Sequence, residues 1–222
     1  MGKTVSVTAS DGHKLDLYRA EPSGKPKGGL VIIQEIFGVN SHMREVCDGF
    51  AKDGYLCVAP ALFYRVERNV ELGYAGADME KAKTTRTQLK WDEVLKDVVA
   101  AQETIKGAGK VGVIGYCFGG SVAWLGATRL NFAGAVSYYG GNVADFATEK
   151  PKCPTICHIG SEDASINAEK VAIIKKARPE VAVYVYEGAG HGFNCNQRGS
   201  WNEAAAKLAR QRTLAFLGKH LD

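Results

Sequence analysis

The chain has 222 residues, of which 45% are hydrophobic and 23% are charged. This is enough for one α/β domain with a sizeable core, and no linker rich in proline, glycine or serine divides it, so we expect a single domain over residues 1–222. The net charge of +4 comes from 28 basic and 24 acidic residues spread along the chain. A charge this small and this evenly spread does not indicate a nucleic-acid-binding surface. It is compatible with an anionic small molecule as the ligand.

The apolar runs are only a handful of residues long, and the N-terminal segment lacks a hydrophobic secretory signal. We therefore expect a soluble, cytoplasmic protein that does not associate with a membrane. Six cysteines could form a disulfide framework, but a chain of this size does not need one, and we expect them to be reduced. Cys153 and Cys157 have no second Cys or His pair nearby at zinc spacing, so we assign no metal.

The first half of the chain predicts an antiparallel hairpin followed by alternating strands and helices. Asp11-Gly12 is a turn dipeptide between two short strand-like runs. The expected elements are the hairpin strands 4–9 and 15–19, a buried strand at 30–33, a helix closed by Gly54, a strand at 55–59 and a helix whose main face runs from Trp91 to Ile105. Between them, residues 62–90 read either as a solvated loop and helix or as a partial cover with anion-binding side chains.

The second half continues the alternation. The expected elements are a strand at 111–114, a helix at 119–129, strands at 132–138 and 155–159, a helix at 168–177, a strand at 181–186 and a final helix from about 202 to 217. Such alternation predicts an α/β fold with a doubly wound, mostly parallel sheet, helices on both faces and no large separate lid domain. The loops after successive strands then meet at one sheet edge, where ligands bind in open α/β sheets.

Residues 115–120, with the sequence GYCFGG, have the layout of a nucleophile elbow, the turn from strand to helix that exposes one side chain above the sheet. Cys117 stands where the usual motif has serine, and the flanking glycines remove side chains that would collide in so tight a turn. Cys117 could instead be a buried, inert thiol. Ser121 also follows the turn, but it would already lie on the helix and is a weak candidate for the nucleophile.

The order of the remaining motifs favours a catalytic role for Cys117. Asp163 follows the apolar run 155–159, and His191 follows the run 181–186. Nucleophile, acid and base in this order are typical of α/β-hydrolases. A turn-forming Asp or an ordinary loop His would explain either residue alone. His158, inside a predicted strand, is more simply a core residue with satisfied hydrogen bonds.

Cysteine reacts as a thiolate, so Cys117 needs a basic or cationic neighbour at neutral pH. His191 can be that neighbour, while Asp163 would hold the imidazole tautomer and stabilise the imidazolium. Backbone N–H groups would bind the oxyanion, and the expected donors are Phe118, after the nucleophile, and Ile36, after an earlier strand. No step of this chemistry requires a cofactor.

Glu35 directly follows a buried strand, where an unpaired charge is costly. It is either a surface carboxylate or is paired with a basic side chain from residues 62–90. If it points at Cys117, it could accept the S–H hydrogen bond and keep the resting group a thiol, which would protect it from oxidation.

Several motifs together resemble the dienelactone hydrolase (carboxymethylenebutenolidase) family, and they cover nearly the whole chain. The matching pieces are QEIFGVN at 34–40 followed by 43–45, GYCFGG at 115–120, YYG at 138–140, GSED at 160–163 and GHGF at 190–193. The resemblance implies hydrolysis of a carboxylate-bearing dienelactone to maleylacetate, or a substituted version, in the ortho-cleavage degradation of catechols, without a cofactor.

The resemblance also implies roles for individual residues. Cys117 would attack the lactone carbonyl, with His191 and Asp163 completing a catalytic triad. Glu35 would hydrogen-bond the resting thiol. In the family, the substrate carboxylate draws an arginine away from that glutamate, which then takes the thiol proton, so that the substrate activates the enzyme.

The arginines that bind the substrate carboxylate in the family do not carry over directly. The position four residues after His191 is Cys195, and Arg198 could replace the missing arginine from the same loop. For the second arginine the register leaves Lys81, Lys83 and Arg86 open, and lysine is not equivalent to arginine for a bidentate contact.

Three functions remain to be weighed. The first is a cysteine-dependent dienelactone hydrolase that acts on a small anionic lactone. The second is a broader carboxylesterase or thioesterase on the same scaffold, and the third is a non-catalytic ligand-binding homologue that retains the fold. The expected partner is a small anionic lactone or ester, and we expect a monomer.

Overall fold

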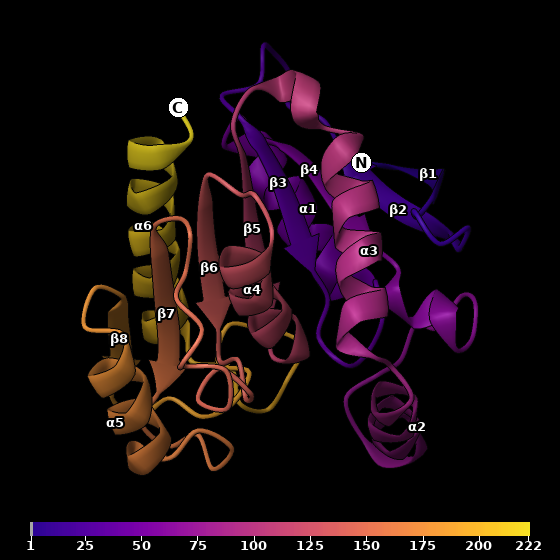
Figure 1. Ribbon diagram of the computed structural model, residues 1–222. Coiled ribbons are helices and arrows are strands. Elements are labelled where there is room, and N and C mark those ends of the chain that lie inside the picture. The colour runs from indigo at the N-terminus through magenta and orange to yellow at the C-terminus, as the bar shows by residue number, and fades with distance from the viewer. Residues whose placement is uncertain (1) are drawn as a thin grey trace. The chain divides into compact units, whose positions relative to one another are not determined.

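The computed structural model describes residues 2–222, which form two compact units (Figure 1). The first unit runs to Gly112 and includes Leu221, and the second runs from Val113 to His220 and includes Asp222. The expectation of a single domain over the chain stays a prediction.

The first unit is built on four strands in the order β1-β2-β4-β3. β1 (Lys3–Thr8) and β2 (Lys14–Ala20) form the predicted antiparallel hairpin, β2 pairs antiparallel with β4 (Leu56–Pro60), and β3 (Gly29–Ile33) runs parallel to β4. The helices are α1 (Ser41–Lys52), α2 (Gly76–Thr87) and α3 (Trp91–Glu103), with short 3-10 turns η1 (Leu62–Arg65) and η2 (Lys106–Ala108).

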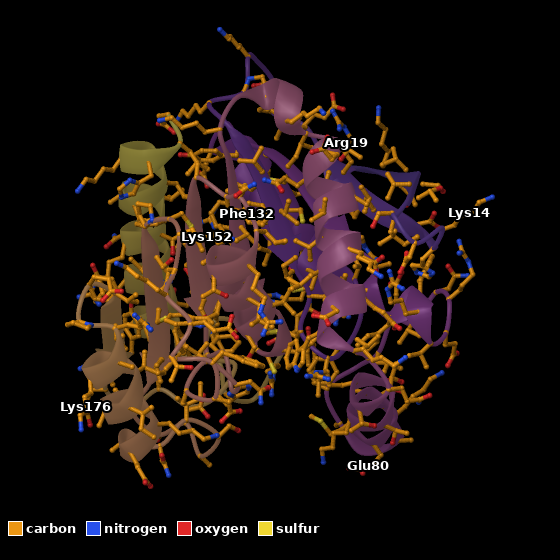
Figure 2. All side chains as sticks on the ribbon, viewed as in Figure 1. Lys14, Arg19, Glu80, Phe132, Lys152 and Lys176 are labelled. Carbon is orange, nitrogen blue, oxygen red and sulfur yellow. The ribbon has the colours of Figure 1, made fainter. Side chains whose placement is uncertain are left out.

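The core of the first unit follows from its apolar runs. Every residue of β3 and β4 is buried. α1 buries the predicted apolar face, which includes Met43 and Phe50, and packs against β4. After the helix, Gly54 adopts φ of +103°, a left-handed conformation that suits glycine. α2 is mostly exposed, and its Glu80 reaches outward in Figure 2.

A buried ion pair ties η1 to α3. The guanidinium of Arg65 makes two hydrogen bonds of 2.7 Å to the carboxylate of Asp97, whose side chain is fully buried. Arg65 also contacts Asp11 at the hairpin turn, at 3.1 Å. The apolar pattern of α3 does not reveal this pair, because Asp97 lies on the buried side of the helix together with apolar residues such as Val94.

The second unit carries four strands in the order β5-β6-β7-β8. They are β5 (Val111–Tyr116), which begins at the boundary, β6 (Gly134–Tyr138), β7 (Thr155–Gly160) and β8 (Ala182–Tyr186). β7 pairs in parallel with both β6 and β8. The helices are α4 (Phe118–Arg129), α5 (Ala168–Ala177) and α6 (Glu203–His220). β6 begins two residues later than predicted, because Phe132, labelled in Figure 2, packs against Gly126 of α4.

A buried polar network joins β6, β7 and β8 to α6. Thr213 of α6 bonds to the Tyr138 hydroxyl at 2.7 Å and to His158 Nε2 at 3.1 Å. His158 Nδ1 bonds to the Tyr186 hydroxyl at 2.8 Å. Burial and the nearby Arg212 charge lower the pKa of His158 to about 3, so this ring is neutral at physiological pH. His158 is thus a core residue with satisfied hydrogen bonds, as predicted.

Helix length and hydropathy also bear on membrane insertion. Among residues 2–222, no helix combines the length and the apolar sequence that crossing a bilayer would require.

Removal of Arg65 should destabilise the protein strongly, because it leaves the carboxylate of Asp97 buried without its cation. We expect Arg65→Met to lower the free energy of unfolding by about 3 to 5 kcal/mol. The matched control is Arg68→Met, since the Arg68 side chain is 55% exposed and reaches Asp16 at only 3.5 Å. The control substitution should lower the free energy of unfolding by about 1 kcal/mol or less. Urea unfolding measures both, and equal costs would show that the buried pair contributes no more than a surface pair.

Candidate active site

Cys117 occupies a strained turn between β5 and α4. Its backbone has φ of 55° and ψ of −117°, which a non-glycine residue rarely adopts. Its N–H donates to the Tyr138 carbonyl at 3.0 Å and its carbonyl accepts from Gly120 at 2.9 Å. A Cβ on Gly115 would lie 1.7 Å from the Gly119 carbonyl oxygen, so only glycine fits there. The geometry matches the predicted elbow and turns the thiol away from the strand.

The loops after β7 and β8 bring Asp163 and His191 to Cys117. His191 Nε2 lies 3.1 Å from Cys117 Sγ, and His191 Nδ1 lies 2.7 Å from Asp163 Oδ2. The two loops touch at Gly160, where a Cβ would lie 2.1 Å from the Ala189 carbonyl oxygen. The Glu162 N–H also donates to that oxygen at 3.0 Å. Thus the second unit joins the three predicted residues in one chain of hydrogen bonds.

The environment of Asp163 holds it as a hydrogen-bond acceptor. Its side chain is fully buried, and Oδ1 accepts the N–H groups of Ser165 at 2.8 Å and Ile166 at 3.2 Å. Two main-chain donors on one oxygen leave the other oxygen for His191. Bonds of this kind fix the orientation of the carboxylate.

His191 is electrostatically favoured as a cation. Burial lowers its pKa, but the hydrogen bonds to Asp163 and Cys117 outweigh burial and raise the pKa to about 10. At neutral pH the arrangement therefore favours an imidazolium beside the sulfur. Such a neighbour is the feature that makes a cysteine reactive.

An aromatic wall supports the imidazole. The ring of Tyr139, which follows β6, lies edge-on to His191 with centroids 5.2 Å apart, and Phe193 packs on Tyr139 at 5.4 Å. Tyr139 itself has a positive φ of 38°. We did not predict this contact, although YYG belonged to the family-like motifs, because the sequence does not show which way the tyrosine side chain points.

Phe118 and Ser121 begin α4 directly after Cys117. Phe118 is the first residue of the helix, where backbone N–H groups point toward the N-terminal end. Ser121 is fully buried, and its Oγ accepts the Asn142 N–H at 3.0 Å. A buried hydroxyl with a structural partner is poorly placed to act as a nucleophile.

Glu35 and Ile36 lie in the first unit, on the turn between β3 and α1. Glu35 is 1% exposed. The turn is anchored by Gln34, whose Oε1 accepts the Leu62 N–H at 3.1 Å and whose Nε2 donates to the Glu35 carbonyl at 3.2 Å. The turn is therefore fixed within its own unit. The roles of Glu35 and Ile36 toward Cys117 stay predictions.

Residues 70–74 form a strap across this turn. The Leu72 N–H donates to the Phe37 carbonyl at 2.9 Å, and a Cβ on Gly38 would lie 1.8 Å from the Val70 carbonyl oxygen. The strap is also held by an ion pair of 2.7 Å between Arg44 and Glu71. Gly38, with φ of +79°, is thus required by the close approach of the strap.

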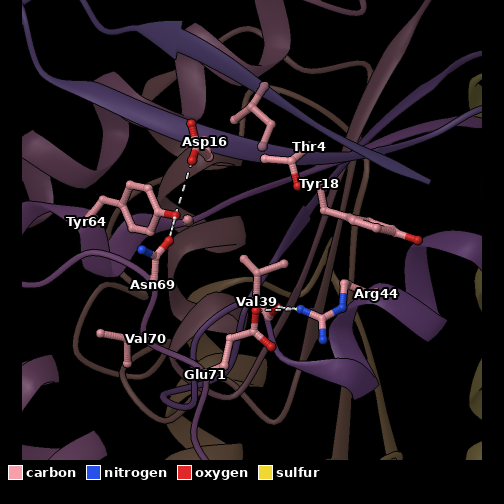
Figure 3. A pocket seen from close by; sticks show the side chains of 11 residues that line it. Thr4, Asp16, Tyr18, Val39, Arg44, Tyr64, Asn69, Val70 and Glu71 are labelled. Carbon is pink, nitrogen blue, oxygen red and sulfur yellow. Dashed lines mark hydrogen bonds and ion pairs between the residues drawn. The ribbon is translucent and has the colours of Figure 1, made fainter. Parts of the chain in front are cut away.

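A small pocket of about 80 Å³ opens beside the strap (Figure 3). Arg44 and Glu71 line one side, and Asp16, Tyr64 and Asn69 line another. The Tyr64 hydroxyl lies 3.2 Å from Asp16 and 2.6 Å from Asn69. The lining residues all belong to the first unit, and none of them is Cys117, Asp163 or His191.

The predicted carboxylate-binding residues have different surroundings. On α2, Lys81 is paired with Glu67 at 2.8 Å, and the Arg86 guanidinium lies 4.4 Å from the centroid of the Trp91 ring. In the second unit, the Arg198 guanidinium packs against Gly192, where it lies 2.4 Å from the position a Cβ would take. Arg198 therefore contacts the residue that directly follows His191. Cys195, where the family has arginine, is fully buried.

A model of the dienelactone hydrolase family matches residues 15–221. The chain belongs to the dienelactone hydrolase family. It is 35% identical to a Synechocystis protein named "Putative carboxymethylenebutenolidase", over 95% of this chain and 94% of that one. It is 32% identical to the carboxymethylenebutenolidase of Pseudomonas putida, over 96% and 94%.

A solved structure supports the same assignment. The crystal structure named "Putative Dienelactone Hydrolase" from Klebsiella pneumoniae is similar with a TM-score of 0.84 and 27% identity, over 98% of this chain and all of that chain. The predicted α/β-hydrolase fold is confirmed. As a member of this family, the protein is a hydrolase of the lactone and ester class, which confirms the prediction that it is an enzyme.

Replacement of Asp163 should remove the charge that holds His191 as a cation. We expect Asp163→Asn to lower the pKa of His191 from about 10 toward its ordinary 6.5, because the hydrogen bond to a carboxylate is lost. In the wild type the raised pKa stabilises the fold fully below pH 6.5, and this contribution is lost as the pH rises toward 10. The free energy of unfolding of the variant should therefore lack this decrease between pH 6.5 and pH 10. NMR titration of the imidazole and urea unfolding against pH measure both effects.

The exposed neighbour Glu162 supplies a control of the same charge type on the same loop. Glu162→Gln should leave the His191 titration in place. If His191 titrates at the same pH in Asp163→Asn as in the wild type, Asp163 does not determine its charge.

Proposed function

We propose that the protein opens a small, carboxylate-bearing enol lactone of the dienelactone type, using Cys117 as nucleophile, His191 as proton carrier and Asp163 as the acid that orients it. The observation that carries the proposal is the chain of hydrogen bonds from Asp163 through His191 to Cys117, at 2.7 and 3.1 Å. A reactive cysteine needs this arrangement, whereas an inert core thiol does not.

The proposed reaction begins with Cys117 as a thiolate, whose proton has passed to Glu35, beside the imidazolium of His191. The thiolate forms a bond to the lactone carbonyl carbon, and the carbonyl oxygen becomes an oxyanion. The backbone N–H groups of Phe118 and Ile36 are the proposed donors to that oxygen. Collapse of the intermediate breaks the ring C–O bond, and His191 gives its proton to the departing enolate oxygen.

Water completes the cycle. His191, now neutral, takes a proton from a water molecule that attacks the thioester at Cys117, and the thiolate leaves with the imidazolium restored. The released enol tautomerises to the keto acid, so a dienelactone would yield maleylacetate. Water is the sole co-reactant, and no cofactor enters the proposed cycle.

Glu35 is the proposed switch of the resting enzyme. A buried carboxylate on a fixed turn can accept the S–H hydrogen bond of Cys117 and later take its proton when the substrate carboxylate draws away a basic partner.

Among the residues proposed to bind the substrate carboxylate, Arg198 has the strongest support, because its guanidinium packs beside the residue that follows His191. Lys81 and Arg86 are the proposed partners from the first unit.

The setting of the reaction is also a proposal. We place it in the ortho-cleavage degradation of catechols, carried out by a cytoplasmic, single-domain monomer. These assignments extend the family membership and the family-like motifs around Cys117, and each is open to direct measurement.

Steady-state kinetics on a dienelactone and on a neutral aryl ester of similar size test the proposed function. We expect turnover of the lactone to exceed that of the ester and to fall at least about 10³-fold in Cys117→Ala, because the nucleophile is lost. Arg198→Ala should raise the KM for the anionic lactone and leave the KM for the neutral ester unchanged.

Other outcomes separate the alternatives. Rapid turnover of the neutral ester alone would favour a broader carboxylesterase or thioesterase and would overturn the anion-binding assignment. Stoichiometric ligand binding without turnover would favour a non-catalytic homologue. Undiminished lactone turnover by Cys117→Ala would overturn the cysteine mechanism itself.

A further inference from the structure

Lys170, near the start of α5, is half-buried and directs its ammonium group at the main chain. Nζ donates to the Ser165 carbonyl oxygen at 2.9 Å and contacts the Gly141 carbonyl oxygen at 3.5 Å. Its own N–H donates to Asn167, the residue that caps the helix, at 3.0 Å. A lysine on a helix surface usually extends into water, so this orientation requires another explanation.

The shorter contact acts on the peptide unit that binds Asp163. The Ser165 carbonyl and the Ile166 N–H belong to one planar peptide group. The carbonyl accepts from the Lys170 ammonium at 2.9 Å, and the N–H donates to Asp163 Oδ1 at 3.2 Å. A cation on the carbonyl polarises the peptide and strengthens donation by its N–H group.

The longer contact reaches the loop after β6. Gly141 lies two residues after Tyr139, whose ring packs edge-on against His191. Lys170 therefore touches the loop that holds Asp163 and the loop that supports His191. The first of these loops follows β7 and the second follows β6, so one ammonium group joins two loops of the sheet edge.

We propose that Lys170 is a positioning residue that keeps Asp163 oriented toward His191 by polarising the Ser165–Ile166 peptide and joining the two loops. Its catalytic consequence rests on the proposed function, whereas its effect on His191 does not. Arginine at this position could make the same contacts, because it keeps the charge and the donors. An apolar side chain of similar length could not.

The chain offers a matched control on the same helix. Lys176 is exposed near the end of α5, and its label in Figure 2 lies at the outer side of that helix. The test compares Lys170→Met, Lys170→Gln and Lys170→Arg with Lys176→Met. NMR titration of the His191 imidazole is the primary readout, and circular dichroism confirms that each variant is folded. The glutamine variant replaces the methionine variant in the comparison if the latter does not fold.

We expect the His191 titration midpoint to fall by about one pH unit in Lys170→Met or Lys170→Gln, since a less well held carboxylate stabilises the imidazolium less. Lys170→Arg and Lys176→Met should titrate like the wild type. On a substrate that the wild type turns over, kcat should fall about 10-fold with little change in KM, which is less than the roughly 100-fold that a 1 Å displacement can cost.

An unchanged His191 titration in folded Lys170→Met or Lys170→Gln would overturn the proposal, even if the variant melts at a lower temperature, because it would reduce Lys170 to a structural contact. The titration does not depend on the substrate. If the dienelactone is not hydrolysed but the midpoint still shifts, the proposed function fails while the role of Lys170 stands.

Discussion

The backbone conformation of Cys117 is the constraint on which the site depends. A non-glycine residue at φ of 55° costs about 1 to 3 kcal/mol, and the surrounding structure must offset that strain. The hydrogen bond from Cys117 to Tyr138 and the absence of a side chain at Gly115 provide the compensation. The strained backbone places the sulfur 3.1 Å from His191 Nε2. The energetic cost of the strain is therefore associated with the positioning of the proposed nucleophile.

A continuous chain of polar contacts then runs outward from the sulfur. His191 bonds to Cys117, Asp163 bonds to His191, and the main-chain N–H of Ile166 bonds to Asp163. Each link constrains the next, and Lys170 extends the chain to the surface of α5. Electrostatics and geometry are therefore inseparable here, because the same contacts that orient the imidazole also favour its charge.

The sequence predicted the strands, the helices outside residues 62–90 and the convergence of Cys117, Asp163 and His191, because parallel strands place successive loops at one edge and the glycines mark tight turns. It did not predict the Arg65–Asp97 pair or the contacts of Lys170, which join segments distant in the chain and depend on side-chain direction. Periodicity reports which face is apolar, and it does not identify a charge that is buried with its partner. The carboxylate-binding residues were hard to place for a related reason, since Cys195 interrupts the family pattern.

The most direct test of the account is mass spectrometry of the protein after rapid acid quenching during turnover of a dienelactone. Ring opening releases no fragment, so the acyl-enzyme should carry the full mass of the lactone. If Cys117 is the nucleophile, the added mass lies on the peptide that contains Cys117 and is absent from Cys117→Ala. Added mass on a different residue, such as Ser121, would contradict the account.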